Sequence, residues 1–151
     1  MMQCADERPP DRPELPFITD EAARCGVEER IRSAWLDFGA GDWMGATVFG
    51  GAAIETLLLW AMGAWTPSAS HATPIDQLVL FGLIEAARAR GLIKEESKRQ
   101  AHLARDARNL VHPGRALRTG SECTKGTALA ALAGIYRIVE DLSAYHSKIG
   151  G

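Results

Sequence analysis

The chain has 151 residues, of which 46% are hydrophobic and 24% are charged, and its formal net charge is −2. This length and composition predict a single soluble domain with a hydrophobic core. The slight negative charge excludes attraction of nucleic acid by the surface as a whole, so any such binding depends on a local patch. Three cysteines without a CxxC pair give no signal for a zinc site or a disulfide framework, and they favour a reducing cytoplasm.

The N-terminal stretch MMQCADERPPDRPELP is rich in proline and carries mixed charge. It has neither the basic start nor the apolar core of a signal peptide. We therefore expect residues 1–17 to form a flexible arm and residues 18–151 to form a single helical domain.

The periodicity of apolar residues predicts five helices and no strand. Their expected ranges are about 20–37, 42–62, 73–91, 94–112 and 124–147. Thr19 is the expected N-cap of the first helix, and Thr73 followed by Pro74 is the expected start of the third. Antiparallel neighbours joined by short loops indicate an all-α, up-down helical bundle of four to five helices.

The second predicted helix is apolar nearly all round. Its stretch from Val48 to Trp65 has the length of a short membrane span, but Glu55 and several glycines interrupt it and no basic flank sets an orientation. This pattern favours a central helix of a soluble bundle over a membrane helix. A carboxylate buried there needs a partner or must stay protonated. Glu55 either orients a functional arginine, forms a structural pair with any basic group, or is simply exposed at the helix edge.

The fourth predicted helix ends in RDARNLVHPGR, where Pro113 stops the helix. At 100° per residue, Arg105, Arg108, Asn109 and His112 fall within an arc of about 100°. Leu103, Ala107 and Leu110 point the other way, which predicts that these apolar residues are buried and that the polar group faces away from the core.

Two interpretations of this polar group remain open. Cations and a histidine in a last turn are favourable for the helix dipole, so the group is in one interpretation a solvated helix end. In the other it is an active site, because histidine transfers protons near neutral pH and arginine binds phosphate through two parallel hydrogen bonds. No glycine-rich phosphate loop or metal-ligand pattern is recognisable, so we expect neither a cofactor nor a metal.

These residues resemble the motif of the HEPN superfamily, in which an Arg is followed after four to six residues by a His. Arg105 and His112 have this spacing, and Asp106 supplies the polar residue that often follows the Arg. The form RNLVHPG, which begins at Arg108, looks like a variant seen in HEPN-like proteins. The stretches GGAAIETLLLWAM and ALAALAGIYRIVEDL look like the family's core helix and final helix.

The resemblance implies a HEPN-like bundle that forms a homodimer through its motif-helix face and cleaves RNA without a metal. Arg105, or Arg108 in its place, would bind the scissile phosphate, and His112 would be the general acid and base. Asn109, Glu55 and Arg115 would orient these groups or bind substrate. The resemblance also implies a toxin or effector of a toxin-antitoxin or defence system, with a nucleotidyltransferase-type antitoxin as partner. The alternative is a non-catalytic HEPN-like module that binds a partner protein or a nucleotide.

Overall fold

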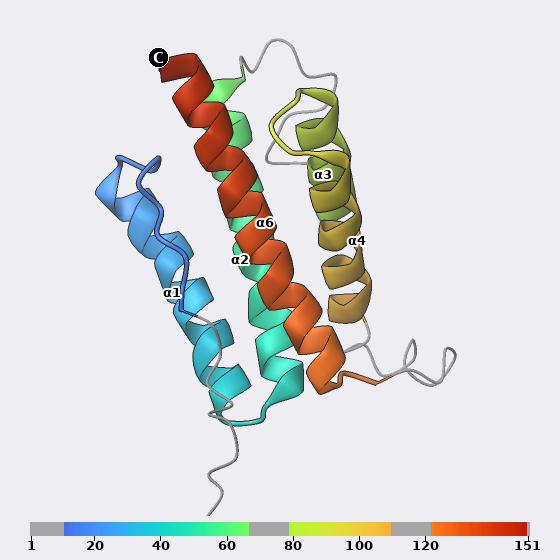
Figure 1. The fold of residues 1–151 in the computed structure, drawn as a ribbon. Helices are drawn as coiled ribbons and strands as arrows, with labels where there is room; N and C mark the ends of the chain where they lie inside the picture. Colours follow the sequence, from blue (N-terminus) through green and yellow to red (C-terminus); the bar gives the residue numbers. More distant parts are fainter. Residues whose placement is uncertain (1–10, 67–78, 110–121, 151) are drawn as a thin grey trace, which may run out of the picture.

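A computed structural model of the protein shows an all-α bundle (Figure 1). The structure describes residues 11–66, 79–109 and 122–150. Within these ranges there is no strand. The helices are α1 (Glu21–Gly39), α2 (Trp43–Trp65), α3 (Leu80–Ala89), α4 (Glu95–Asn109) and α6 (Lys125–Gly150). The prediction of an all-α helical bundle is confirmed.

Helices α2 and α6 form the middle of the bundle, with α1 on one side and α3 and α4 on the other (Figure 1). Thr47 of α2 meets Thr127 of α6 near one end, and Trp65 meets Tyr145 near the other, so α2 and α6 run in the same direction. Helix α1 is antiparallel to α2, and α4 is antiparallel to both α3 and α6 (Figure 1).

The first two helices begin at aspartate caps. Asp20 accepts a hydrogen bond from the backbone N–H of Ala23, and Asp42 accepts one from Gly45. The expectation that Thr19 caps α1 was therefore wrong by one residue, because the carboxylate of Asp20 satisfies the free N–H and also suits the positive end of the helix dipole. The predicted start of the third helix at Thr73 and Pro74 lies outside the described residues.

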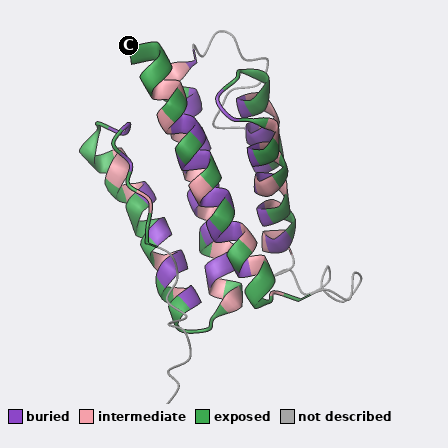
Figure 2. Ribbon diagram, viewed as in Figure 1, coloured by how far each residue is buried: buried purple, intermediate pink, exposed green. Residues whose placement is uncertain are grey.

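Helix α2 is the central helix that the sequence predicts. It contacts all four other described helices, and its buried positions supply much of the core (Figure 2). Among the described helices it alone has the length and hydropathy of a membrane span, and half of its most apolar 18-residue window is buried within the bundle. The tryptophans contribute to the core: Trp35 is buried, and the others pack against the core. Those others are Trp43, Trp60 and Trp65.

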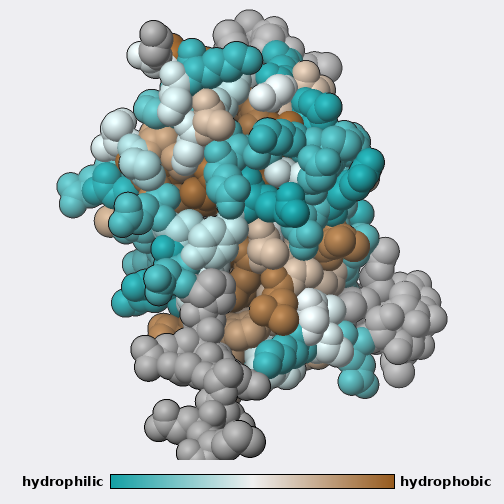
Figure 3. All heavy atoms as spheres, viewed as in Figure 1, coloured by the Kyte–Doolittle hydropathy of each residue, from teal (hydrophilic) through white to brown (hydrophobic). Residues whose placement is uncertain are grey.

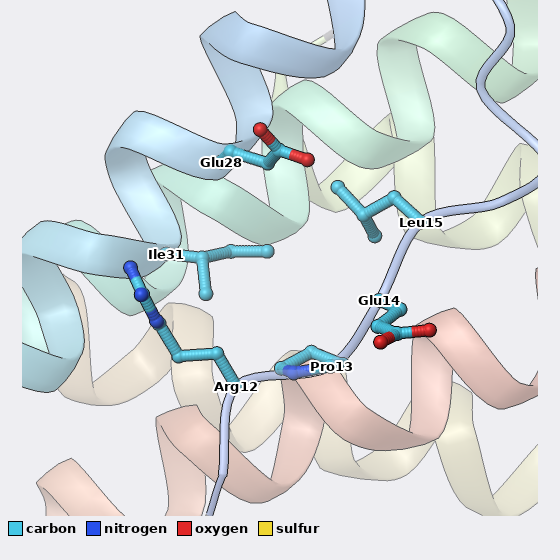
Figure 4. Close-up of a pocket in the computed structure, with 6 residues that line it drawn as sticks. All are labelled: Arg12, Pro13, Glu14, Leu15, Glu28 and Ile31. Atoms are coloured by element: carbon cyan, nitrogen blue, oxygen red, sulfur yellow. The ribbon is translucent and has the colours of Figure 1, made fainter.

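The hydrophobic core begins before residue 18, inside the stretch that the sequence assigned to the arm. Leu15 and Phe17 are buried, and Phe17 packs against Trp60 at a ring-centroid distance of 5.7 Å. Burial of these two apolar side chains removes hydrocarbon from water, and this favours packing of the proline-rich segment onto the bundle. A shallow cavity of about 370 Å³ separates the segment from α1, with Leu15 facing Ile31 (Figure 4).

Several large hydrophobic side chains stay exposed on the bundle. The face that has α6 in front is hydrophilic over much of its upper part, with hydrophobic patches between hydrophilic side chains (Figure 3). The exposed large hydrophobic residues are Leu36, Met44, Phe49, Val79, Phe81, Leu103, Leu129 and Ile149.

Candidate functional site

Helix α4 carries three of the six predicted site residues, and it is rotated relative to the sequence prediction. Its buried residues are Ser97, Ala101, Ala104 and Ala107, whereas Leu103 is 56% exposed. The prediction that Leu103 is buried was wrong, and the buried face lies about a quarter of a turn from the predicted one. Small side chains let α4 approach α2 and α6 closely, and this close packing outweighs the burial of one leucine.

Because of this rotation, Arg108 faces α2 instead of solvent. Its Nη1 donates a hydrogen bond of 2.7 Å to Oε2 of Glu55, and about two thirds of each side chain is buried. The prediction that the whole polar group points away from the bundle core was therefore wrong for Arg108. Glu55 is thus paired with Arg108 and not simply exposed at the helix edge, and this position is compatible with orienting an arginine and with a structural ion pair.

Gly51 makes room for this ion pair. A Cβ atom at Gly51 would lie 2.8 Å from Cδ of Arg108, closer than carbon atoms normally approach. The glycine thus lets the arginine side chain cross the surface of α2 and reach Glu55, which lies one helical turn further along. Among the described residues, Arg108 uses Nη1 for Glu55, so its Nε and Nη2 atoms are candidate donors for a ligand.

Arg105 lies on the other edge of α4, against α3. Its guanidinium carbon is 5.1 Å from the centre of the Phe81 ring, and Nη2 donates to Oδ1 of Asp106 at 2.9 Å. Its Nε is buried and has no hydrogen-bond partner among the described residues. The two arginines of the motif therefore have separate surroundings: one is stacked on an aromatic ring and the other is paired with a carboxylate of the central helix.

The remaining site residues are described only in part. Asn109 is the last described residue of α4 and is half-buried. His112 and Arg115 lie outside the described residues, as does the predicted helix end at Pro113. Among the described residues, no group of three or more His, Cys, Asp or Glu side chains is arranged to hold a metal ion.

A second polar cluster, which no motif in the sequence marks, joins α3 to α4. Glu85 Oε1 lies 2.8 Å from Nε2 of His102, and Glu85 Oε2 lies 3.3 Å from Nζ of Lys98. These contacts, the hydrogen bond with His102 first, lower the pKa of the Glu85 carboxyl. The four-residue spacing of Lys98 and His102 places both on one face of α4, which is a signal that the sequence does contain.

His102 also packs on the ring of Phe81, at a centroid distance of 5.0 Å. Phe81 therefore lies beside both His102 and Arg105, and the three side chains form one continuous surface over α3 and α4. This surface is adjacent to the Arg108 site along α4 but does not share its carboxylate partner, because Glu55 belongs to α2.

Comparison of the chain with protein-family models, with curated proteins and with solved structures finds no match.

Proposed function

We propose that the protein is a HEPN-like, metal-independent endoribonuclease that acts in the cytoplasm. The observation that carries the proposal is the hydrogen bond from Arg108 to Glu55. A carboxylate that takes one donor of a guanidinium fixes its orientation and leaves the other donors for a phosphate. Arg108 is on this ground the arginine of the motif, and Glu55 is its positioning residue.

His112 supplies the proton transfer in this proposal. The ribose 2′-hydroxyl gives up its proton as its oxygen bonds to the adjacent phosphorus, and the bond to the 5′-oxygen breaks as that oxygen takes a proton. Arg108 stabilises the negative charge that grows on the phosphate, and Asn109 orients the reacting groups. Arg108 and His112 are four residues apart, which on a continued helix is the spacing of side chains on one face.

A homodimer through the motif-helix face forms part of the proposal. One copy offers a shallow surface, and a second copy would add a second Arg and His set opposite the first. The proposed role is that of a toxin or effector with a nucleotidyltransferase-type antitoxin as partner.

The test is RNA cleavage in EDTA by the wild-type protein and by His112→Ala, with the oligomeric state measured by light scattering. We expect the wild type to cleave and the variant to lose cleavage by about a hundredfold or more, while it keeps its helicity and oligomeric state. A folded wild-type dimer that leaves a broad set of RNAs intact would overturn the nuclease proposal.

One observation favours the alternative, a non-catalytic module that binds a partner protein or a nucleotide. Both motif arginines already face a carboxylate, Arg105 with Asp106 and Arg108 with Glu55. Such pairing reduces the positive potential that attracts RNA. For this alternative we expect no cleavage in EDTA and an unchanged binding of the partner in His112→Ala.

A further inference from the structure

A groove of about 650 Å³ lies where the turn between α3 and α4 meets the last turns of α6. Figure 1 shows this turn and the end of α6 at the same end of the bundle. Gly91 has a φ of 75°, so the chain reverses there and directs Leu92 and Ile93 into the core beneath the groove. A cavity of this size is in the range of small-molecule sites.

Positive charge predominates around the groove. The cations that line it are Arg88, Arg90, Lys94 and Lys148. Two carboxylates line it as well, and both are already engaged: Glu95 pairs with Arg88 at 3.1 Å, and Asp141 accepts a hydrogen bond of 2.8 Å from the backbone N–H of Lys94. Within the described part of the chain, the ammonium groups of Lys94 and Lys148 have no acidic partner. A chain with a net charge of −2 thus carries a local excess of positive charge here.

Part of the wall on the α6 side is apolar, beside Asp141 and Lys148 of the same helix. Ile149 is 52% exposed, and Ala144 and Tyr145 lie beside it along the helix. Tyr145 is held in place by Trp65 of α2, at a ring-centroid distance of 5.1 Å. The hydrogen bond from Lys94 to Asp141 ties the opposite wall to α6. The groove therefore has an apolar surface and two unpaired ammonium groups on a rigid frame.

We propose that this groove binds a small organic anion, with its carboxylate or phosphate between Lys94 and Lys148 and its apolar body on Ala144 and Ile149. The ammonium groups attract the charged end, and the apolar wall contributes by removing hydrocarbon from water. The site is independent of the nuclease proposal. It lies about 20 Å from Arg108, by the rise along α4.

The test is an NMR titration of the full chain labelled with ¹⁵N, using sodium octanoate, octyl phosphate, inorganic phosphate and 1-octanol as probes. We expect saturable shifts at Gly91, Ala144 and Ile149 with octanoate, octyl phosphate or both, and the stronger of the two identifies the headgroup. Inorganic phosphate and octanol should each bind with an affinity at least about tenfold lower, because each offers only one half of the interaction.

The charge-reversal variant Lys94→Glu/Lys148→Glu should bind the octyl anions about tenfold more weakly. The control is Arg137→Glu, an exposed cation on α6 outside the groove, which should change the affinity by about twofold or less. The proposal is overturned if octanol binds as tightly as the anions, if both variants lose affinity equally, or if no probe gives saturable shifts at the groove.

Discussion

Glu55 of α2 and Arg108 of α4 form a hydrogen-bonded ion pair of 2.7 Å across 53 positions of sequence. The pair joins the central helix to the helix that carries the motif. Its side chains are about two thirds buried, so water screens their attraction less than at an open surface. One contact thus serves both the packing of α4 and the orientation of the arginine that we propose as the phosphate ligand.

A double-mutant cycle with Glu55→Gln and Arg108→Gln should show a coupling free energy of about 1 kcal/mol, the upper end for a partly exposed pair. Each single variant loses the ion pair, so the double variant should be less destabilised than the sum of the two. Urea unfolding of the four proteins measures the term. Strictly additive losses would mean that the pair does not stabilise the fold.

Substitution of Gly51 should disturb this pair through packing. In Gly51→Ala the new Cβ would lie 2.8 Å from Cδ of Arg108, so the arginine must move. We expect a destabilisation of about 1 kcal/mol or more, by thermal unfolding. The control is Gly63→Ala on the same helix, where nothing lies within 4 Å and helix propensity should stabilise by about 0.5–1 kcal/mol. Equal effects of the two substitutions would contradict the account.

The Asp37 carboxyl should destabilise the fold at neutral pH. Burial, and then the charge of Asp42, raise its pKa above the ordinary value of 3.8. When folding raises the pKa of a carboxyl group, the group's contribution to stability is present below the pKa it has in the unfolded chain. This contribution is lost as the pH rises through the pKa it has in the folded protein. Asp37→Asn should therefore be more stable than the wild type at pH 7, and the difference should shrink below about pH 3.8. Exposed Glu29→Gln on the same helix is the control, and a pH-independent difference would count against this explanation.

The Glu85 carboxyl should have the opposite effect. The hydrogen bond with His102 and the contact with Lys98 lower its pKa below 4.5. Its stabilisation is therefore present above the unfolded pKa of 4.5 and is lost as pH falls through the lower folded pKa. Glu85→Gln should be less stable than the wild type at pH 6, with the gap closing in acid. Denaturant unfolding from pH 6 into acid measures this difference, with the exposed Glu140→Gln as the control. A difference in the free energy of unfolding that persists in acid would point to lost packing instead.

Capping residues, glycines and apolar periodicity predicted where the helices lie. They did not predict which face of α4 is buried, because that depends on tertiary packing. The aspartates and glycines at 37–45 and the apolar run of α2 define two helices and the turn between them, whatever the rest of the chain does. The burial of Leu103 was predicted from its hydrophobicity, but α4 packs through alanines and Ser97 because these permit a closer approach. Periodicity weighs large side chains more than small ones, and this is why the predicted face of α4 was about a quarter of a turn away.

The candidate site was predictable residue by residue but not in its pairing. The sequence motif identified Arg105, Arg108 and Asn109 as candidates. Glu55 became a candidate because it is a lone carboxylate in an apolar helix. Which arginine meets Glu55 depends on the rotation of α4 and on the space at Gly51, and neither can be read from spacing along one helix. The cluster around Glu85 depends in the same way on the register between α3 and α4.

The measurement that tests the central claim most directly is the single-turnover rate of RNA cleavage in EDTA by Arg108→Gln and by Arg105→Gln, each checked for wild-type helicity. If Arg108 is the phosphate ligand that Glu55 orients, Arg108→Gln should slow cleavage by about 10²–10³-fold and Arg105→Gln by about tenfold or less. Loss of cleavage in Arg105→Gln with a near-normal rate in Arg108→Gln would contradict the account.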